Sequence, residues 1–376
     1  MAHSYPRHEG DGAGAFILRL AVALAGQGVD VHAIAPSAAG VRPAEVLSGI
    51  PVTRFRYAPA SMETLAYGGT MIAEARRTGG IAMLGLLAAA RRATAQAIAR
   101  HRIDVVHAHW WFPSGLSAAS VARVPIVTTM HGTDVRIARA VPLSRPAFRW
   151  VLKRSAACTT VSRWLGDSVR EMAPAAEPLV APMPAATELF TPGGDRDHRR
   201  VLFVGRLNAQ KGARHLLDAV ARMRSSARVR LIGGGPDAAA LRQQAEQLGI
   251  GERLEWLPAM PQHALADQYR QAAVVVVPSM EEGLGMVAVE AQLCGAAVLA
   301  SASGGLTDVV EDDRTGVLVP PADPDALARA LDALMENPER AGTLGEAGRR
   351  SALARFAPDA VAARYADIYR QARGAR

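Results

Sequence analysis

Cysteine and lysine are both scarce in this chain. Its 376 residues include 2 cysteines, Cys158 and Cys294, which lie far apart in the sequence and in apolar surroundings. This scarcity argues against a disulfide framework and a cysteine metal cluster, and it favours buried thiols in a reducing compartment. Only Lys153 and Lys211 are lysines among the 43 basic residues, so a lysine at a motif position stands out from the arginines.

Long apolar runs are also absent. The longest apolar stretch, residues 81–90, is too short to span a bilayer, and no basic segment followed by an apolar run opens the chain. We therefore expect a cytoplasmic protein, either soluble or peripheral at the inner face of the membrane. The flanking Arg76, Arg77, Arg91 and Arg92 allow this stretch to lie on an anionic membrane surface. A helix packed on a sheet, with solvated arginines at its ends, explains the same pattern.

Acidic residues are fewer than basic ones, 35 against 43, which gives a formal net charge of +8. This charge permits attraction to nucleic acid, phosphorylated substrates or lipid headgroups. The basic residues are spread over many segments, and no basic run is interleaved with aromatics as on nucleic-acid surfaces. We expect no nucleic-acid partner. The length and the 49% hydrophobic content are enough for two domains with separate cores.

Apolar runs alternate with segments of helical periodicity along the chain, which predicts doubly wound α/β domains. The predicted parallel strands are residues 29–35, 52–57, 103–107, 125–129, 158–161 and 178–181 in the first half, and 201–205, 229–232, 254–257, 273–277, 297–300 and 317–319 in the second. A stretch rich in proline, glycine and charge, residues 182–200, predicts a boundary between them. We expect an N-terminal domain over residues 1–187, a C-terminal domain over 188–357, and terminal helices over 325–336, 341–356 and 358–373.

A glycine-rich loop, Gly10-Asp11-Gly12-Ala13-Gly14, leads into a helix predicted over residues 15–27. Free backbone N–H groups and the helix dipole at such an N-terminus suit an anion, although an ordinary glycine turn has the same composition. Residues 1–9 are too few to hold a full preceding strand, so we expect the first strand of the N-terminal domain to be missing or incomplete.

Two predicted strands of the first half end in polar clusters. One leads into His107-Ala108-His109-Trp110-Trp111-Phe112 and the other into Met130-His131-Gly132-Thr133-Asp134. Ligands of open α/β sheets bind outside the carboxyl ends of the strands, where both clusters lie. His107 and His109 lack a third metal ligand at useful spacing, so packing at the strand end is favoured for them. His131 is a stronger candidate, since Gly132 lets a ligand approach closely and Asp134 can orient an imidazole.

In the second half, three strand ends carry candidate ligand-binding residues. Arg206 and Lys211 lie five residues apart between a strand and a helix, where two cations can grip a diphosphate. Gly233-Gly234-Gly235-Pro236 follows the next strand. Glu282 lies at a turn after a third strand, and Glu290 lies inside an otherwise apolar helix, where an ionised carboxylate needs hydrogen-bond donors.

In their order, these motifs resemble the retaining, nucleotide-sugar-dependent glycosyltransferases of the GT-B fold, in particular family 4, the glycosyl transferases group 1. The most specific element is the pair Glu282 and Glu290 with seven residues between them, preceded by Pro278-Ser279. The resemblance covers nearly the whole chain. It implies an α/β fold of two Rossmann-like doubly wound domains facing across a cleft, with the C-terminal helix, residues 358–376, packing back on the N-terminal domain.

The resemblance also implies roles for single residues. Arg206 and Lys211 bind the donor diphosphate, and Glu290 holds the ribose hydroxyls of the nucleotide. The expected catalytic residues are Glu282, which contacts the transferred sugar, and His131, which reaches the sugar near the anomeric carbon. Four consecutive residues complete the donor site through backbone N–H groups: Gly283, Leu284, Gly285 and Met286.

For the glycine-rich loop, the resemblance implies contact of Gly12 and Gly14 with the acceptor or a phosphate, although Asp11-Gly12 stands where many relatives have paired glycines. The expected partners are a nucleotide-sugar donor and a glycan or lipid-linked acceptor. No metal and no cofactor are expected, because Arg206 and Lys211 supply the positive charge for the leaving diphosphate.

The implied activity is transfer of a hexose from a nucleotide-diphosphate sugar to an acceptor, as in polysaccharide biosynthesis, with retention of anomeric configuration. A lipid-linked or cell-envelope acceptor is a hypothesis from the basic apolar segment and from Trp110-Trp111-Phe112. Retention proceeds by a same-face route, in which the leaving phosphate helps to deprotonate the acceptor, or through a covalent intermediate on a carboxylate. The resemblance favours the same-face route.

Three alternatives remain open from the sequence: a non-catalytic nucleotide-sugar-binding protein, a GT-B sugar-nucleotide epimerase and a nicotinamide dehydrogenase. The dehydrogenase needs an acidic residue at the end of its second strand. Here Asp30 lies before residues 31–35, and the strand ends in Pro36-Ser37, which weighs against that alternative.

Overall fold

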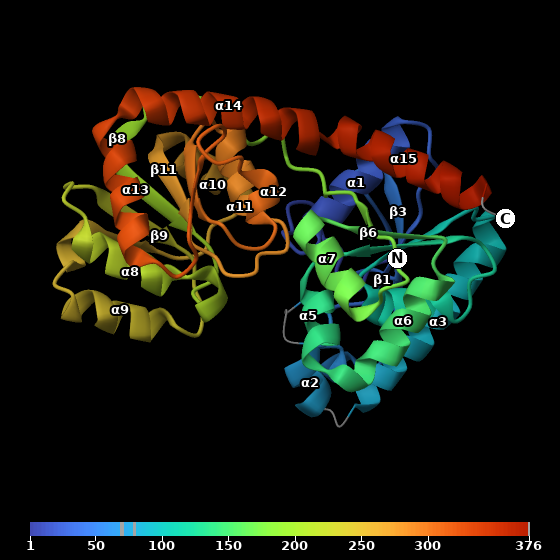
Figure 1. Cartoon of the computed structure of the whole chain (residues 1–376). Helices are drawn as coiled ribbons and strands as arrows, with labels where there is room; N and C mark the ends of the chain where they lie inside the picture. The colour runs from blue at the N-terminus through green and yellow to red at the C-terminus, as the bar shows by residue number, and fades with distance from the viewer. Residues whose placement is uncertain (68–70, 78–79, 375–376) are drawn as a thin grey trace. The chain divides into compact units, whose positions relative to one another are not determined.

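The computed structural model describes residues 1–67, 71–77 and 80–374 (Figure 1). The chain forms two compact units. Unit 1 comprises Met1–Pro184 and Pro358–Arg376, and unit 2 comprises Ala185–Ala357. Each unit is built mainly of parallel strands connected by helices, as the alternation of apolar runs predicts.

Unit 2 contains a six-stranded, fully parallel sheet with the strand order β10-β9-β8-β11-β12-β13. The strands are β8 (Asp197–Val204), β9 (Arg228–Ile232), β10 (Leu254–Leu257), β11 (Ala272–Val277), β12 (Ala297–Ser301) and β13 (Val317–Val319). In the centre of the sheet every residue of β11 and β12 is buried. Strands covered on both faces are continuous apolar runs in the sequence, which explains why these two central strands were predictable.

The sheet of unit 2 is covered by helices on both faces (Figure 1). They are α8 (Ala213–Arg222), α9 (Ala238–Gln247), α10 (Gln262–Gln271), α11 (Met286–Leu293), α12 (Leu306–Val309), α13 (Pro324–Glu336) and α14 (Pro338–Phe356). Helices α8, α9 and α13 contribute leucines and alanines to one core with β8, β9 and β11. Two of the helices begin at side-chain caps, Asp323 for α13 and Asn337 for α14, which satisfies N–H groups at the helix start.

Unit 1 contains two sheets instead of one. The first has the order β1-β3-β2 and the second β4-β5-β6-β7. The strands are β1 (Ala33–Pro36), β2 (Ala44–Leu47), β3 (Ile50–Phe55), β4 (Val106–His109), β5 (Ile126–Met130), β6 (Ala157–Thr160) and β7 (Leu179–Val180). Strand β2 pairs with β3 in the antiparallel direction and was not predicted. Its partly exposed residues lack the apolar run of the other strands.

Met1 and Ala2 bridge the two sheets of unit 1. The N–H of Ala2 donates to the carbonyl of Ile34 in β1 at 3.1 Å, and the N–H of His109 in β4 donates to the carbonyl of Met1 at 2.9 Å. Met1 and Ala2 therefore connect β1 and β4 through backbone hydrogen bonds. A cavity of about 890 Å³ lies beside them and is lined by residues of β1, β4, α1, α3 and α15.

The helices of unit 1 are α1 (Ala15–Gly26), α2 (Met71–Arg77), α3 (Ile81–His101), α4 (Leu116–Ala119), α5 (Thr133–Ala140), α6 (Arg145–Arg154), α7 (Arg163–Met172) and α15 (Pro358–Gly374). Helix α15 docks on this unit through Tyr365, whose hydroxyl donates to the carbonyl of Ala181 at 2.9 Å, and through Tyr369, which is hydrogen-bonded to His107 at 2.6 Å. These contacts join α15 to β4, which contains His107, and to Ala181, the residue that follows β7.

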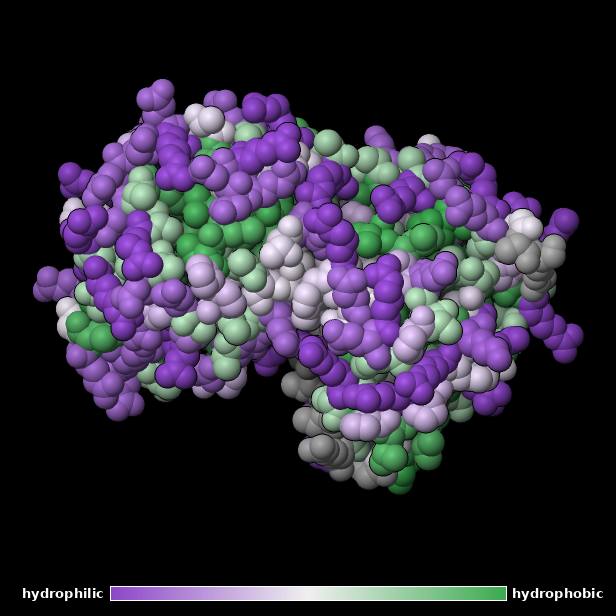
Figure 2. All heavy atoms as spheres, viewed as in Figure 1, coloured by the Kyte–Doolittle hydropathy of each residue, from purple (hydrophilic) through white to green (hydrophobic). Residues whose placement is uncertain are grey.

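The apolar stretch over residues 81–90 is the first half of α3. Ala82, Leu86 and Ala90 are buried, whereas Ile81 and Leu84 are exposed. One side of this stretch therefore packs on the unit, and the other side faces solvent. No helix in the described part of the chain has the length and apolar character to cross a bilayer. The surface seen in Figure 2 is mainly hydrophilic, with hydrophobic residues in separate areas.

Candidate functional site

The loops at the carboxyl ends of β8, β9, β11 and β12 pack directly against one another, and glycines make this possible. A Cβ on Gly233 would overlap the carbonyl oxygen of Gly205, and a Cβ on Gly212 would overlap that of Pro278. Gly212 and Gly233 also have positive φ angles of 68° and 145°. Only glycine fits such close approaches at these backbone angles, so the sequence brings four loops to one edge of the sheet.

Lys211 and Glu282 form an ion pair at this edge, with 2.6 Å between Nζ and Oε2. Lys211 is fixed by the side chain of Asn208, whose Oδ1 accepts the N–H of Lys211 at 3.1 Å. Arg206 lies exposed in the same loop. The structure thus brings together Arg206, Lys211 and Glu282, as predicted, but the ion pair between the last two was not foreseen.

The turn that carries Glu282 is held by the loop after β12. The N–H of Glu281 donates to Oγ of Ser303 at 3.0 Å, and the N–H of Gly305 donates to the carbonyl of Glu282 at 2.7 Å. Glu281 has a positive φ of 50°, a conformation rare for a non-glycine residue. The sequence analysis missed Ser303 and Gly305, although a Ser-Gly-Gly triplet directly after a buried strand was the signal that would have indicated them.

Glu290 lies in α11 and is only 8% exposed. Its Oε2 accepts a hydrogen bond from the hydroxyl of Tyr269 at 2.9 Å. Burial, and then the charge of Glu290, raise the pKa of Tyr269 well above its ordinary value, so the phenol stays protonated and donates. Tyr269, on α10, is the donor that a carboxylate in an apolar helix requires, and its position in the sequence gave no indication of this role.

The four residues predicted to offer backbone N–H groups surround the start of α11. Gly285 is the residue before the helix, with a φ of 96°, and Met286 is its first residue. Leu284 is buried and Gly283 is partly exposed. They lie between Glu282 and Glu290 at the same edge of the sheet.

In unit 1, Asp134 does not orient the imidazole of His131. Its Oδ1 instead accepts the backbone N–H groups of His131 at 3.1 Å and of Gly132 at 3.0 Å, and its Oδ2 accepts that of Trp111 at 3.2 Å. The interpretation of Asp134 as a partner of the ring was therefore wrong. A buried carboxylate at the start of α5 satisfies backbone donors that have no partner inside the helix.

His109 is the ring partner of His131, with 3.1 Å between Nδ1 of His109 and Nε2 of His131. His107 is hydrogen-bonded to Tyr369 at 2.6 Å and to Thr129 at 2.7 Å. The predicted strand, residues 103–107, includes His107 but not His109, whereas both lie inside β4, which starts three residues and ends two residues later than predicted. Their bonds agree with a packing role, and no group of three or more histidine, cysteine or acidic side chains in residues 1–67, 71–77 and 80–374 is arranged to hold a metal ion.

The aromatic cluster after β4 lies beside His131. The Trp110 ring is 4.7 Å from that of His131 and 4.2 Å from that of His3, measured between centroids. Trp111 is buried, and its indole N–H donates to the carbonyl of Asp134 at 2.7 Å. Trp111 therefore fills the core, whereas Trp110 forms part of the surroundings of His131.

The glycine-rich loop before α1 has two different glycines. Gly14 has a φ of 71° and packs so closely on Ser4 that a Cβ would overlap the Ser4 carbonyl, whereas the position of a Cβ on Gly12 is open. Asp11 organises the loop by accepting the N–H of Ala13 at 3.1 Å and by pairing with Arg7 at 2.6 Å. Gly14 thus has a structural reason to be glycine, while Gly12 leaves room for a ligand.

We expect the histidine cluster to make unit 1 sensitive to acid. Burial lowers the pKa of His131 to about 3 and that of His3 to about 4, and it lowers those of His107 and His109 well below the ordinary 6.5. The unfolded chain therefore binds more protons than the folded one below about pH 6.5, so stability falls as the pH is lowered from there. Urea unfolding between about pH 7.5 and 5 measures this slope.

His131→Gln should make that slope shallower, whereas His8→Gln, at an exposed histidine of the same unit, should leave it unchanged. Equal stability of the wild-type protein at both ends of the pH range would contradict the lowered pKa values of these histidines.

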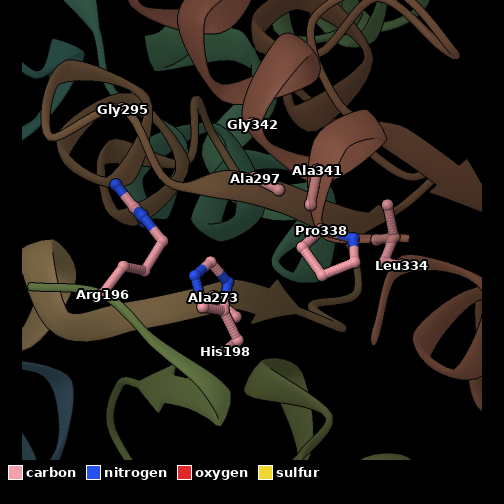
Figure 3. Close-up of a pocket in the computed structure, with 9 residues that line it drawn as sticks. All are labelled: Arg196, His198, Ala273, Gly295, Ala297, Leu334, Pro338, Ala341 and Gly342. Carbon is pink, nitrogen blue, oxygen red and sulfur yellow. The ribbon is translucent and has the colours of Figure 1, made fainter. Parts of the chain in front are cut away.

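A small cavity in unit 2 lies away from these loops. It has a volume of about 160 Å³ and is lined by residues such as Arg196, Ala273 and Ala297 (Figure 3). Ala273 and Ala297 are at the amino ends of β11 and β12. Arg196 there donates to the carbonyl of Cys294 at 3.3 Å. The cavity is thus at the edge of the sheet opposite to Lys211 and Glu282, and it is not part of the site.

Comparisons with known proteins agree with this geometry. The profile of the family "Glycosyl transferases group 1" matches residues 187–351, and that of "Glycosyltransferase Family 4" matches residues 10–182. A D-inositol 3-phosphate glycosyltransferase of Xylanimonas cellulosilytica is 36% identical over 72% of this chain and 72% of its own length.

Two solved structures are similar over nearly the whole chain. Sucrose-phosphate synthase of Thermosynechococcus elongatus matches with a TM-score of 0.81 and 25% identity, covering 96% of this chain and 94% of that one. The Anabaena protein Alr3699/HepE, solved in complex with UDP-glucose, matches with a TM-score of 0.71 and 19% identity, covering 96% and 97%. The chain therefore belongs to glycosyltransferase family 4, the glycosyl transferases group 1, and is a glycosyltransferase with the GT-B fold.

Proposed function

We propose that this enzyme transfers a hexose from a nucleotide-diphosphate sugar to a glycan or lipid-linked acceptor of the cell envelope, with retention of anomeric configuration. The observation that carries the proposal is the ion pair of Lys211 with Glu282 at the carboxyl edge of one parallel sheet, with Arg206 in the same loop as Lys211 and Glu290 in the helix that follows Glu282. This edge is where open α/β sheets bind ligands. The similar Anabaena protein, solved with UDP-glucose, supports a nucleotide-sugar donor.

The departing diphosphate is the group that the two cations serve. Cleavage of the bond between sugar and diphosphate leaves negative charge on the phosphate oxygens, and cations fixed at that place stabilise the transition state more than the bound substrate. Lys211 is already oriented by Asn208 and Glu282. Glu282 then has a second use, since its carboxylate can accept hydrogen bonds from hydroxyls of the transferred sugar while it holds Lys211.

The same-face route to retention fits this cluster better than a covalent intermediate does. A nucleophilic carboxylate has to be free to attack, whereas Glu282 is paired with Lys211 at 2.6 Å and Glu290 is hydrogen-bonded to Tyr269. In the same-face route the leaving phosphate takes the proton of the acceptor. His131 remains the residue of unit 1 that we propose to act on the sugar, and Gly12 the one that we propose to approach the acceptor.

Nucleotide binding and sugar transfer are tested separately. A thermal-shift screen against UDP, GDP, ADP and their sugars should show stabilisation by one base, because a ligand that binds only the folded protein raises its melting temperature. Incubation with the selected donor and with D-inositol 3-phosphate, the acceptor named for the Xylanimonas relative, or with lipid-linked glycans then identifies the acceptor. Tight nucleotide binding without hydrolysis or transfer from any donor would leave only the non-catalytic alternative.

Replacement of Glu290 by glutamine should weaken nucleotide binding about tenfold. A neutral amide accepts from two ribose hydroxyls less well than a carboxylate, and hydrogen bonds to charged groups contribute about 1.5–3 kcal/mol. Isothermal titration calorimetry with the preferred nucleotide measures the change. Glu246→Gln, on the exposed side of α9, is the matched control, and equal affinities of the two variants would refute the ribose role of Glu290.

A further inference from the structure

One long segment of unit 1 is free of acidic residues. Residues 135–166 contain no aspartate or glutamate and have seven basic residues: Arg136, Arg139, Arg145, Arg149, Lys153, Arg154 and Arg163. The formal net charge of this segment, +7, is therefore almost as large as that of the whole chain, +8. The basic residues of the chain are spread over many segments, and this one is distinguished by its lack of acidic residues.

Helix α6 turns much of this charge toward solvent. Its inner side consists of Phe148, Val151 and Leu152, which are buried in the unit. Four other side chains of the helix, spaced three or four residues apart, are exposed: Arg149, Trp150, Lys153 and Arg154. Residues at such spacings lie on one side of a helix. An aromatic ring therefore stands among three cations on the outer side of α6.

Apolar side chains are exposed beside these cations. The turn between α5 and α6, which includes the 3-10 helix Pro142–Ser144, exposes 93% of Leu143 and 44% of Val141, and Trp150 on α6 is 42% exposed. Single exposed apolar residues are ordinary, but here three of them lie in a stretch of ten residues, 141–150, inside the segment without acidic residues. We call this set the α5–α6 surface: Val141, Leu143, Arg145, Arg149, Trp150, Lys153 and Arg154.

Carboxylates do not neutralise the cations of α6. Arg149 donates to the backbone carbonyl of Met172 at 2.7 Å, and Arg145 donates to that of Ala138 at 3.4 Å. In the part of the chain that the structure describes, no acidic side chain pairs with Arg145, Arg149 or Lys153. The surface therefore keeps its charge for an outside partner.

We propose that the α5–α6 surface binds an anionic lipid membrane, with Leu143 and Trp150 entering the interface and the basic side chains contacting lipid headgroups. Each Lys or Arg near an anionic leaflet contributes about 1 kcal/mol, and an aromatic ring with a polar N–H suits the boundary between headgroups and acyl chains. An exposed leucine at the tip of a turn is accounted for by insertion into lipid. This inference does not depend on the donor chemistry proposed above.

A lipid surface explains Leu143 better than a nucleic acid does. Nucleic acids bind cations through phosphates and stack their bases on aromatics, so they account for the arginines and for Trp150. They offer nothing to an aliphatic side chain that is 93% exposed. Substitution of Leu143 therefore separates the two kinds of partner.

The test is flotation of the full-length protein with vesicles of phosphatidylcholine, either alone or with about one third phosphatidylglycerol. We expect binding to the anionic vesicles only, and weaker binding as salt is added. The double variant Lys153→Glu/Arg154→Glu should lower the partition coefficient at least tenfold. Leu143→Asp, which removes the apolar side chain without removing a cation, should lower it several-fold.

Matched controls lie on α3. Leu84→Asp changes a leucine that is 70% exposed, and Arg91→Glu/Arg92→Glu reverses two exposed arginines, so both should leave flotation unchanged. Far-UV circular dichroism and melting temperature show that each variant is folded. The proposal is refuted by failure to bind anionic vesicles, by binding that depends on α3 instead, or by binding of single-stranded RNA that is indifferent to Leu143→Asp while vesicles are ignored.

Discussion

Replacement of Lys211 by alanine should lower kcat by about two orders of magnitude or more, the loss that follows when one fixed charge stabiliser is removed from a transition state. Lys211 is the only lysine of unit 2, its backbone is capped by Asn208, and its Nζ lies 2.6 Å from Glu282. The substitution removes a cation and also leaves Glu282 without this partner. We therefore expect kcat to fall more than donor affinity.

Arg206→Ala should cause a comparable loss, but for a simpler reason. Arg206 is exposed in the loop after β8, so its removal takes away a cation without disturbing a partner such as Glu282. Arg222→Ala, at an arginine of the same unit whose guanidinium is 3.3 Å from Asp325 on the surface, is the control and should keep normal rates. Steady-state kinetics with the preferred donor measure all three variants. Near-normal rates for Arg206→Ala and Lys211→Ala would show that the diphosphate binds elsewhere.

A variant of Glu282 distinguishes its two proposed contacts. Glu282→Gln keeps a hydrogen-bonding side chain but loses the ion pair with Lys211. If the carboxylate serves mainly to orient the lysine, this variant and Lys211→Ala should impair the same step, and the double variant should be little worse than either single one. Independent losses that add in the double variant would indicate a separate contact of Glu282 with the sugar.

The strands of unit 2 were predictable because each holds an apolar run, which is buried on both faces in the central strands β11 and β12. β10 and β13 have the predicted bounds, and the other four differ by one to four residues at an end. Unit 1 was less predictable for two physical reasons. β2 is a half-exposed antiparallel strand without an apolar run, and β4 begins three residues later than its apolar run suggested. β4 also ends two residues later than predicted, which places His109 in the sheet instead of in the loop after it.

The positions of the candidate donor residues followed from the sequence, but their partners did not. Lys211 and Glu282 are 71 residues apart in the sequence, so no periodic pattern joins them. Tyr269 lies on a different helix from Glu290 and meets it only because α10 and α11 flank the same strand, β11. Pairings of this kind depend on tertiary packing, which local patterns do not encode.

Asp134 and the α5–α6 surface illustrate two other limits. An acidic residue three positions after a histidine predicts a ring partner as readily as a helix cap, and only the structure shows that Asp134 accepts backbone N–H groups. For the α5–α6 surface, the basic residues were visible, but the sequence does not tell which of them face outward. The burial of Phe148 and the exposure of Leu143 supply that information.

Replacement of Gly233 by alanine should destabilise unit 2 by about 3 kcal/mol or more. Gly233 has a φ of 145°, and a Cβ there would overlap the carbonyl oxygen of Gly205. A non-glycine residue in such a region costs about 1–3 kcal/mol even without a collision. Relief of the collision requires the loops after β8 and β9 to separate. Because the first of them carries Arg206 and Lys211, donor affinity should fall together with stability.

Gly234→Ala is a matched control for this prediction, since a Cβ on the adjacent Gly234 has nothing within 4 Å and its backbone does not require glycine. For a domain of this size, 1 kcal/mol corresponds to about 2–4 °C in Tm. Differential scanning calorimetry should therefore show the Gly233→Ala transition of unit 2 lowered by roughly 6 °C or more, and the Gly234→Ala transition within about 1–2 °C of wild type. Equal melting temperatures for the two variants would mean that the loops after β8 and β9 are not in contact, and the close packing on which the proposed donor site depends would be wrong.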